Sequence, residues 1–168
     1  MTPIFMTPAL RKFLLTTHVA TSVGCIGAVA AYLSLAVVGL NGVEGTIART
    51  IHGAMDLIGW YVVTPLCIAA LVTGVAQSLA TPWGVFRYWW IVAKLALTIL
   101  TIAVLVRTLN HASETLAMSV LHADHLIELR PHLMTHACLG LAVLVTITTI
   151  SIYKPWGPTP LGRRLKRS

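Results

Sequence analysis

The sequence predicts an all-α integral membrane protein, a four-helix up-down bundle with a short outer amphipathic helix between its third and fourth long helices. Of the 168 residues, 57% are hydrophobic and only 10% are charged, whereas charged residues make up about 25% of a soluble domain. Two runs, 57–76 and 133–152, contain no Asp, Glu, Lys or Arg. About 20 apolar residues in a helix cross a hydrocarbon core about 30 Å thick, so each run is long enough to span a membrane.

Four apolar segments predict the long helices of a single transmembrane domain, residues 1–168, at about 13–40, 46–79, 88–110 and 131–153. They are too long for barrel strands, which need only about 9–11 residues. Arg11 and Lys12 precede the first segment as in a signal peptide, but its apolar stretch is much longer than the usual h-region of about 7–15 residues, which favours a retained helix. Pro65 predicts a kink in the second segment, with Thr64 available to compensate for the lost hydrogen bond.

The connections between these segments are mostly short, which is typical of antiparallel neighbours in a bundle. The longer connection, 111–130, contains no Gly or Pro. Its apolar residues recur near helical spacing: Leu116, Val120, Leu121, Leu126 and Leu129. We therefore expect the short amphipathic helix here, lying on the outer surface of the membrane.

Basic residues are distributed unequally between the two sides of the segments. One side carries Arg11, Lys12, Arg87 and the basic residues of the tail 154–168, namely Lys154, Arg163, Arg164, Lys166 and Arg167. The other side carries Arg49, Arg107 and Arg130 together with the acidic Glu44, Glu114, Asp124 and Glu128. The positive-inside rule therefore predicts a multi-pass protein of the bacterial cytoplasmic (inner) membrane with both termini in the cytoplasm.

The net charge of +7 follows from this topology and from attraction to anionic lipid, and it does not indicate a nucleic-acid partner. The expected partners are the lipid bilayer and a membrane redox partner or quinone. No nucleophile–base pair, phosphate loop or nucleotide fingerprint is present in the sequence, so hydrolase and ATPase functions have no support.

Histidines concentrate at the outer ends of the segments, where six of the seven fall. His52 and Asp56 share one face of the second helix, and His132 and His136 share one face of the fourth. Polar groups at this depth usually face the bundle interior. One hypothesis is a b-type haem held by His52 and His136, with His132 as the substitute ligand and Asp56 as the partner of the outer ring nitrogen.

A second hypothesis is a copper or zinc site in the outer connection, where His122, Asp124 and His125 lie close in sequence and His111 is nearby. Nitrogen and oxygen ligands of this kind suit zinc or oxidised copper. The alternative is that no cofactor is bound and that the histidines titrate or serve structure in a non-catalytic transporter subunit or assembly factor.

Three further residue types lie toward the inner side or inside the segments. Cys25, Cys67 and Cys138 show no CxxC pattern and are interpreted as small buried hydrophobes. Lys94 is expected to extend its ammonium group toward the cytoplasmic interface. His18, near the cytoplasmic end of the first helix, is either an interhelical hydrogen-bonding group or an inner ligand.

Three stretches carry a family resemblance: LLTTHVATSVGCIGAVAAYLSLAVVGL, DLIGWYVVTPLCIAALVTG and WGVFRYWWIVAKLALTILTIAVL. Over about residues 12–110 the chain resembles a family of small uncharacterised bacterial integral membrane proteins. That family is itself similar to the membrane domain of copper-resistance D-type proteins and to small haem-binding membrane bundles. The resemblance implies that His18 corresponds to the histidine of their first helix, which makes it a candidate ligand.

Overall fold

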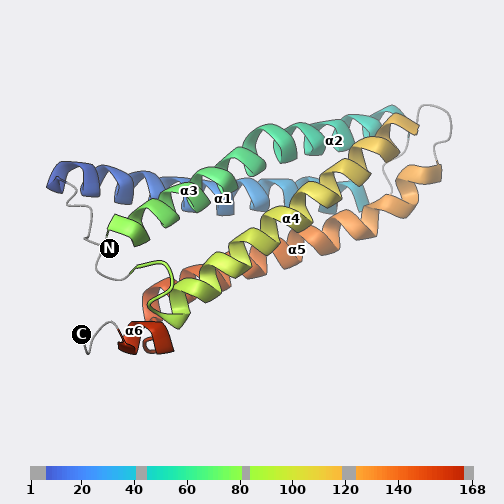
Figure 1. Ribbon diagram of the computed structural model, residues 1–168. Helices are drawn as coiled ribbons and strands as arrows, with labels where there is room; N and C mark the ends of the chain where they lie inside the picture. Colours follow the sequence, from blue (N-terminus) through green and yellow to red (C-terminus); the bar gives the residue numbers. More distant parts are fainter. Residues whose placement is uncertain (1–6, 41–44, 81–83, 119–123, 165–168) are drawn as a thin grey trace.

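The computed structural model describes residues 7–40, 45–80, 84–118 and 124–164, which are helical except for short connections (Figure 1). The elements are α1 (Pro8–Leu40), α2 (Gly45–Ile58), the π-helical turn η1 (Gly59–Val63), α3 (Thr64–Ala80), α4 (Trp89–Met118), α5 (Asp124–Tyr153) and α6 (Pro160–Arg164). Within these ranges the only β pairing is an isolated bridge between Tyr88 and Pro158. The all-α fold class is confirmed.

Four helices are long and apolar enough to cross a membrane: Pro8–Leu40, Thr46–Ala80, Trp89–Ala117 and Pro131–Tyr153. Large apolar side chains lie exposed on the outside of these helices, among them Phe13, Val23, Val72, Ile99 and Leu139. A soluble monomer rarely exposes apolar surface on this scale, whereas lipid tails are as apolar as leucine. The chain is therefore a multi-pass membrane protein.

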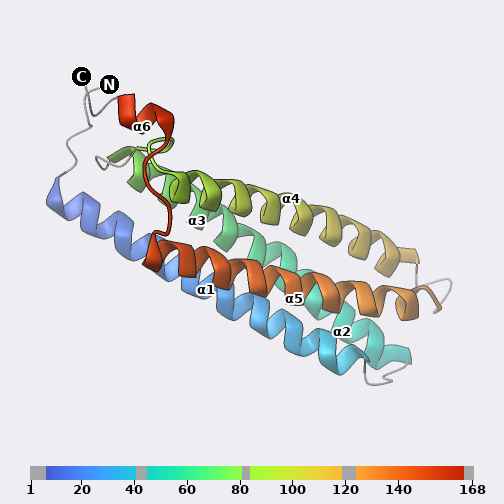
Figure 2. The ribbon, with the colours of Figure 1, turned by 90° about the horizontal axis from the view of Figure 1, so that it is seen from below.

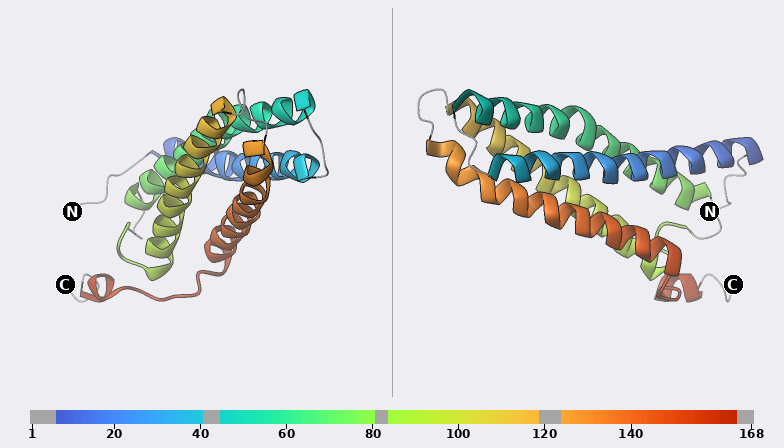
Figure 3. Two further views of the ribbon diagram at one scale, coloured as in Figure 1. Left: turned by 90° about the vertical axis from the view of Figure 1, so that its right-hand side faces the viewer. Right: turned by 180° about the vertical axis from the view of Figure 1, so that it is seen from behind.

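Among the long helices, α1 contacts α2, α3 and α5, and α4 likewise contacts α2, α3 and α5. The four helices lie close together at the end where α1 and α5 meet α2 (Figures 1 and 2). Toward the end that holds Pro8 and α6, the pair α1 and α3 separates from the pair α4 and α5 (Figures 1 and 3). We call these the outer end and the inner end, respectively.

Buried side chains form separate groups along the bundle. The outer group contains Tyr32, Ala36, Met55, Leu109, Ala112, Leu133 and Ala137. The middle group consists of Cys25, Val29, Val63 and Cys67, and the inner group of Trp90, Ile91 and Ile150. The inner group joins α4 to α5 only, which agrees with the separation of the two helix pairs there.

The second membrane span is interrupted where the sequence predicts a kink, next to Pro65. The turn η1 occupies Gly59–Val63, and the Thr64 side chain donates a hydrogen bond to the Gly59 carbonyl over 2.8 Å. The backbone N–H of Thr64 donates to the same carbonyl, which is the five-residue spacing of a π-helix. Gly59 also permits close packing, because a Cβ atom there would collide with the buried side chain of Leu109.

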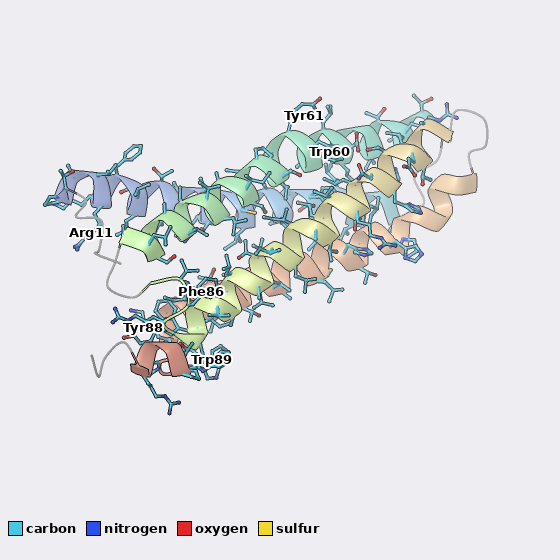
Figure 4. All side chains as sticks on the ribbon, in the orientation of Figure 1. Arg11, Trp60, Tyr61, Phe86, Tyr88 and Trp89 are labelled. Carbon is cyan, nitrogen blue, oxygen red and sulfur yellow. The ribbon has the colours of Figure 1, made fainter. Side chains whose placement is uncertain are left out.

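At the inner end, the C-terminal segment is held against the start of α4. Thr159 donates its backbone N–H to the Arg87 carbonyl over 3.0 Å and its hydroxyl to the Phe86 carbonyl over 2.7 Å. A Cβ atom on Gly162 would collide with that Arg87 carbonyl, so α6 depends on glycine at this position. Phe86, Tyr88, Trp89 and the basic Arg11 all lie at this end (Figure 4).

The outer connection differs from the expectation. The stretch 111–130 does not form a separate short helix in its described part, because α4 continues to Met118 and α5 begins at Asp124. Residues 119–123 lie outside the described residues. Neither Gly nor Pro follows Asn110 in this stretch, and Ala112 packs in the outer group of buried side chains. The helix therefore continues beyond its predicted end. Pro131, expected as a helix start, lies inside α5 instead.

Candidate functional site

A cavity of about 470 Å³ lies between α1, α3, α4 and α5 toward the inner end. This volume falls within the range of about 300–1,000 Å³ that is typical of ligand sites. Its walls are mostly apolar, and its polar groups come from all four helices: His18, Ser22, Gln77, Lys94, Thr98 and Ser151. An apolar hollow with a few convergent polar groups is the usual form of a small-molecule site.

His18 is the imidazole on the cavity wall, and α3 fixes its orientation. Its Nδ1 lies 3.0 Å from the carbonyl oxygen of Ala70 and 3.1 Å from the hydroxyl of Thr73. A carbonyl can only accept, so Nδ1 carries the proton and Nε2 keeps its lone pair. Within the described part of the chain, Nε2 has no hydrogen-bond partner. A ring nitrogen held in this way leaves the other one ready to bind a ligand.

Gly74 provides the space that this imidazole occupies. A Cβ atom at position 74 would lie 3.0 Å from Cε1 of His18 and 3.5 Å from its Nδ1. The ring therefore lies against the backbone of α3 one turn beyond Ala70. Any larger residue at position 74 has to displace the ring or the helix.

Two lysines give the inner end of the cavity a positive charge. Nζ of Lys94 donates a hydrogen bond to the Ser151 hydroxyl over 2.9 Å and lies 4.8 Å from the centre of the Trp90 ring. Nζ of Lys154 lies 5.7 Å from the same ring. Lys94 extends back toward the start of α4, the direction expected from the sequence, and it reaches Trp90 on the cavity wall. The arrangement favours an anionic group at this end.

Cys25 and Cys67 meet at the middle of the bundle and also line the cavity. Both are buried, at 1% and 4% exposed, and their Sγ atoms lie 2.7 Å apart. Their burial agrees with the prediction of small buried hydrophobes, but their contact was not predicted, and Cys138 is exposed instead. Cys25 follows His18 by seven residues, and Cys67 precedes Gly74 by seven. Once His18 is known to lie opposite Gly74 on an antiparallel neighbour, the two cysteines have to face each other.

The structure does not bring together the histidines of the outer haem hypothesis. His52 is buried, its Nδ1 lies 2.8 Å from the Ala48 carbonyl of its own helix, and it packs beside Leu133 in a gap with no room for a water molecule. His132 and His136 are exposed on the outside of α5, with Nδ1 of His136 2.7 Å from the His132 carbonyl. Leu133 forms the buried side of α5 between them.

Asp56 has a partner other than His52. The Ser113 hydroxyl of α4 donates to Oδ1 of Asp56 over 2.5 Å, and Nε1 of Trp60 donates to the same Ser113 oxygen over 3.2 Å. This short chain of hydrogen bonds connects the second span to α4. A carboxylate that is buried or faces lipid needs hydrogen-bond partners. These contacts therefore give Asp56 a structural role that does not require a cofactor.

The residues proposed for a copper or zinc site lie only partly within the described structure. His111 is exposed, and its Nδ1 lies 3.4 Å from the Thr115 hydroxyl of the next turn. His122 lies outside the described residues, as do the side chains of Asp124 and His125. Among the side chains that the structure does describe, no group of three or more His, Cys, Asp or Glu residues is arranged to hold a metal ion.

Fold and cavity together define a multi-pass helical membrane protein with a ligand-sized hollow in its inner half. No family model, curated protein or solved structure matches the chain. Its function is therefore argued from the site alone.

Proposed function

We propose that this protein is a small redox protein of the bacterial cytoplasmic membrane that binds haem b in the cavity through His18. The observation that carries the proposal is the fixed imidazole: Nδ1 donates to the Ala70 carbonyl, while Nε2 has no partner within the described residues. Histidine ligands of haem and metals almost always use one ring nitrogen for such an anchor. Haem supplies reversible one-electron transfer, and its partner would be a membrane redox protein or quinone.

The surroundings of His18 support haem over a bare metal ion. The walls are apolar, as a hydrophobic macrocycle requires, and the cavity volume suits an organic ligand. Lys94 and Lys154 near the Trp90 ring supply positive charge for carboxylates such as the propionates. By contrast, His18 is not arranged with two or more further His, Cys, Asp or Glu side chains, among the described residues, in a group that could hold a bare metal ion.

The proposed orientation in the membrane follows from where the charges lie. Arg11, Arg87, Lys154 and Arg163 all belong to segments at the inner end, together with the aromatic residues at the start of α4 (Figure 4). Basic residues favour the cytoplasmic side, and Tyr and Trp favour the membrane interface. We therefore propose an up-down bundle with both termini in the cytoplasm and the cavity in the cytoplasmic leaflet.

Absorption spectroscopy on two matched variants tests the haem proposal. Full-length protein purified in detergent from haem-supplemented cells should show a Soret band that shifts on reduction with dithionite. His18→Ala should abolish the band because it removes the ligand, whereas His136→Ala should retain it because His136 is exposed on the outside of α5. A colourless wild-type protein that takes up no added haemin, or a full Soret band in His18→Ala, would refute the proposal.

Metal analysis of the same samples separates this function from the copper or zinc hypothesis for the outer connection. Stoichiometric zinc or copper that is lost in the variant His122→Ala with His125→Ala would establish the second site. The same result would leave the Soret measurement unaffected. No structural observation favours that site, so haem is the function we propose.

A further inference from the structure

The contact between Cys25 and Cys67 has no role in the haem proposal. From it we infer that the two thiols form an intramembrane redox couple that reduces a lipid-soluble quinone entering the cavity. The inference concerns the haem-free chain, because haem and quinone would occupy the same cavity and use the same His18 and Lys94, and it does not depend on haem binding. It assigns an activity, thiol–quinone oxidoreduction, to two residues that the sequence motifs leave without a function.

The two thiols are close enough to react with each other. The Sγ atoms lie 2.7 Å apart on two different helices, α1 and α3, so they have to approach by less than about 1 Å to reach the bond length of about 2.05 Å. Both side chains border the cavity, with Cys67 4% and Cys25 1% exposed, so a ligand in the cavity lies beside the pair. Cys138, in contrast, is exposed on α5 and has no such neighbour among the described cysteines.

The depth of the pair determines what can oxidise it. Cys25 lies midway along the span Pro8–Leu40, and Cys67 lies well inside the span Thr46–Ala80. Glutathione disulfide and thioredoxin-like proteins are polar and cannot enter the hydrocarbon core. A quinone dissolves there, and the apolar walls suit its ring and isoprenoid chain.

The reaction is balanced without any further reactant. The S–H bonds of Cys25 and Cys67 break and an Sγ–Sγ bond forms, which releases two protons and two electrons. The quinone takes up both electrons and both protons and becomes the quinol. His18 and Lys94, on the wall of the same cavity, supply polar groups for the quinone oxygens, with His18 about two helical turns from Cys25.

Quinone reduction by the full chain tests this inference directly. Reduced, haem-free wild-type protein in lipid nanodiscs is mixed with decylubiquinone under anaerobic conditions, and quinone absorbance and intact mass are followed. We expect about one quinol per chain and a mass loss of about 2 Da from disulfide formation. Oxidised glutathione in place of the quinone should give neither change within the same time.

The matched variants are Cys25→Ser, Cys67→Ser and Cys138→Ser. The first two should lose quinone reduction, while Cys138→Ser should react as the wild type does. Wild-type protein that keeps its thiols in the presence of the quinone, or equal reaction of Cys25→Ser, would overturn the inference. The wild-type mass measurement needs no variant to fold, and the Soret band is measured separately on haem-loaded wild-type protein and on Cys138→Ser, where it should be the same. Failure here is therefore distinguishable from failure of the haem proposal.

Discussion

The substitution Gly74→Ala should move the His18 ring while leaving the stability of α3, the helix that carries Gly74, nearly unchanged. A Cβ atom there lies 3.0 Å from Cε1 of His18, closer than ordinary contact between carbon atoms at about 3.5–4.0 Å. The ring has to move by a few tenths of an ångström, which lengthens the 3.0 Å hydrogen bond from Nδ1 to Ala70. We expect haem affinity to fall by about 10–100-fold, the usual effect of losing the partner of a ligating histidine.

The same substitution should change unfolding little. Alanine is favoured over glycine inside a helix by about 1 kcal/mol, and weakening a hydrogen bond costs about 0.5–1.5 kcal/mol. The two effects nearly cancel, so the free energy of unfolding of Gly74→Ala should stay within about 0.5 kcal/mol of the wild type. Loss of ligand binding without loss of stability is therefore the expected signature.

Gly27→Ala is the matched control, because Gly27 is also within a membrane helix and a Cβ atom there meets nothing within 4 Å. It should gain up to about 1 kcal/mol in stability and bind haem normally. Haem titration by Soret absorbance and unfolding in mixed micelles measure the two quantities. If Gly74→Ala matches Gly27→Ala in both, the His18 ring does not depend on Gly74 and the reasoning fails.

Two other glycines give predictions that do not involve a ligand. Gly59→Val should destabilise the bundle by about 1–3 kcal/mol, the usual cost of overpacking, because the new side chain collides with Leu109; unfolding in mixed micelles measures it. Gly162→Ala should release the C-terminal segment from the Arg87 carbonyl and increase its cleavage by a protease added to the inner face, while the spans stay folded.

Each of these substitutions has a control in the same chain. A Cβ atom on Gly53 or on Gly157 would meet nothing within 4 Å, so Gly53→Val should cost much less than Gly59→Val, and Gly157→Ala should not change the cleavage pattern. Equal destabilisation of both valine variants would argue against close packing at the π-helical turn. Unchanged cleavage of Gly162→Ala would argue against the contact between α6 and Arg87.

The four spans could be predicted from the sequence because hydropathy and length alone define them. Which face of a span turns inward could not, because lipid and protein core are equally apolar. His136 and Leu133 show the difficulty. Residues three positions apart lie on the same side of a helix, but here the histidine is exposed and the leucine is buried. Polar side chains were predicted to face the bundle interior: His52 is buried as predicted, whereas His136 is exposed.

The site at the inner end depends on information that a single helix does not contain. From its position alone, His18 is either an interhelical hydrogen-bonding group or an inner ligand, and the family resemblance adds weight to the ligand. Its hydrogen bond to Ala70 requires the register between α1 and α3. The contact of Cys25 with Cys67 follows from the same register. The sequence has no CxxC or other local pattern that reports it, because the partners are 42 positions apart.

The π-helical turn Gly59–Val63 sets the rotational phase of everything that follows it in the second span. Each residue of an α-helix advances by about 100°, so a continuous α-helix from Ala48 would carry Cys67 about 100° away from the buried face. The turn absorbs one extra residue, and Ala48, Met55 and Cys67 all remain buried. Deleting a single residue from the turn would restore a regular α-helix and keep Cys67 on the face that meets Cys25. A regular α-helix of unchanged length would instead rotate Cys67 away from Cys25 by about 100°. Homologues with one residue fewer at this place should therefore be able to keep the cysteine pair without a π-helical turn.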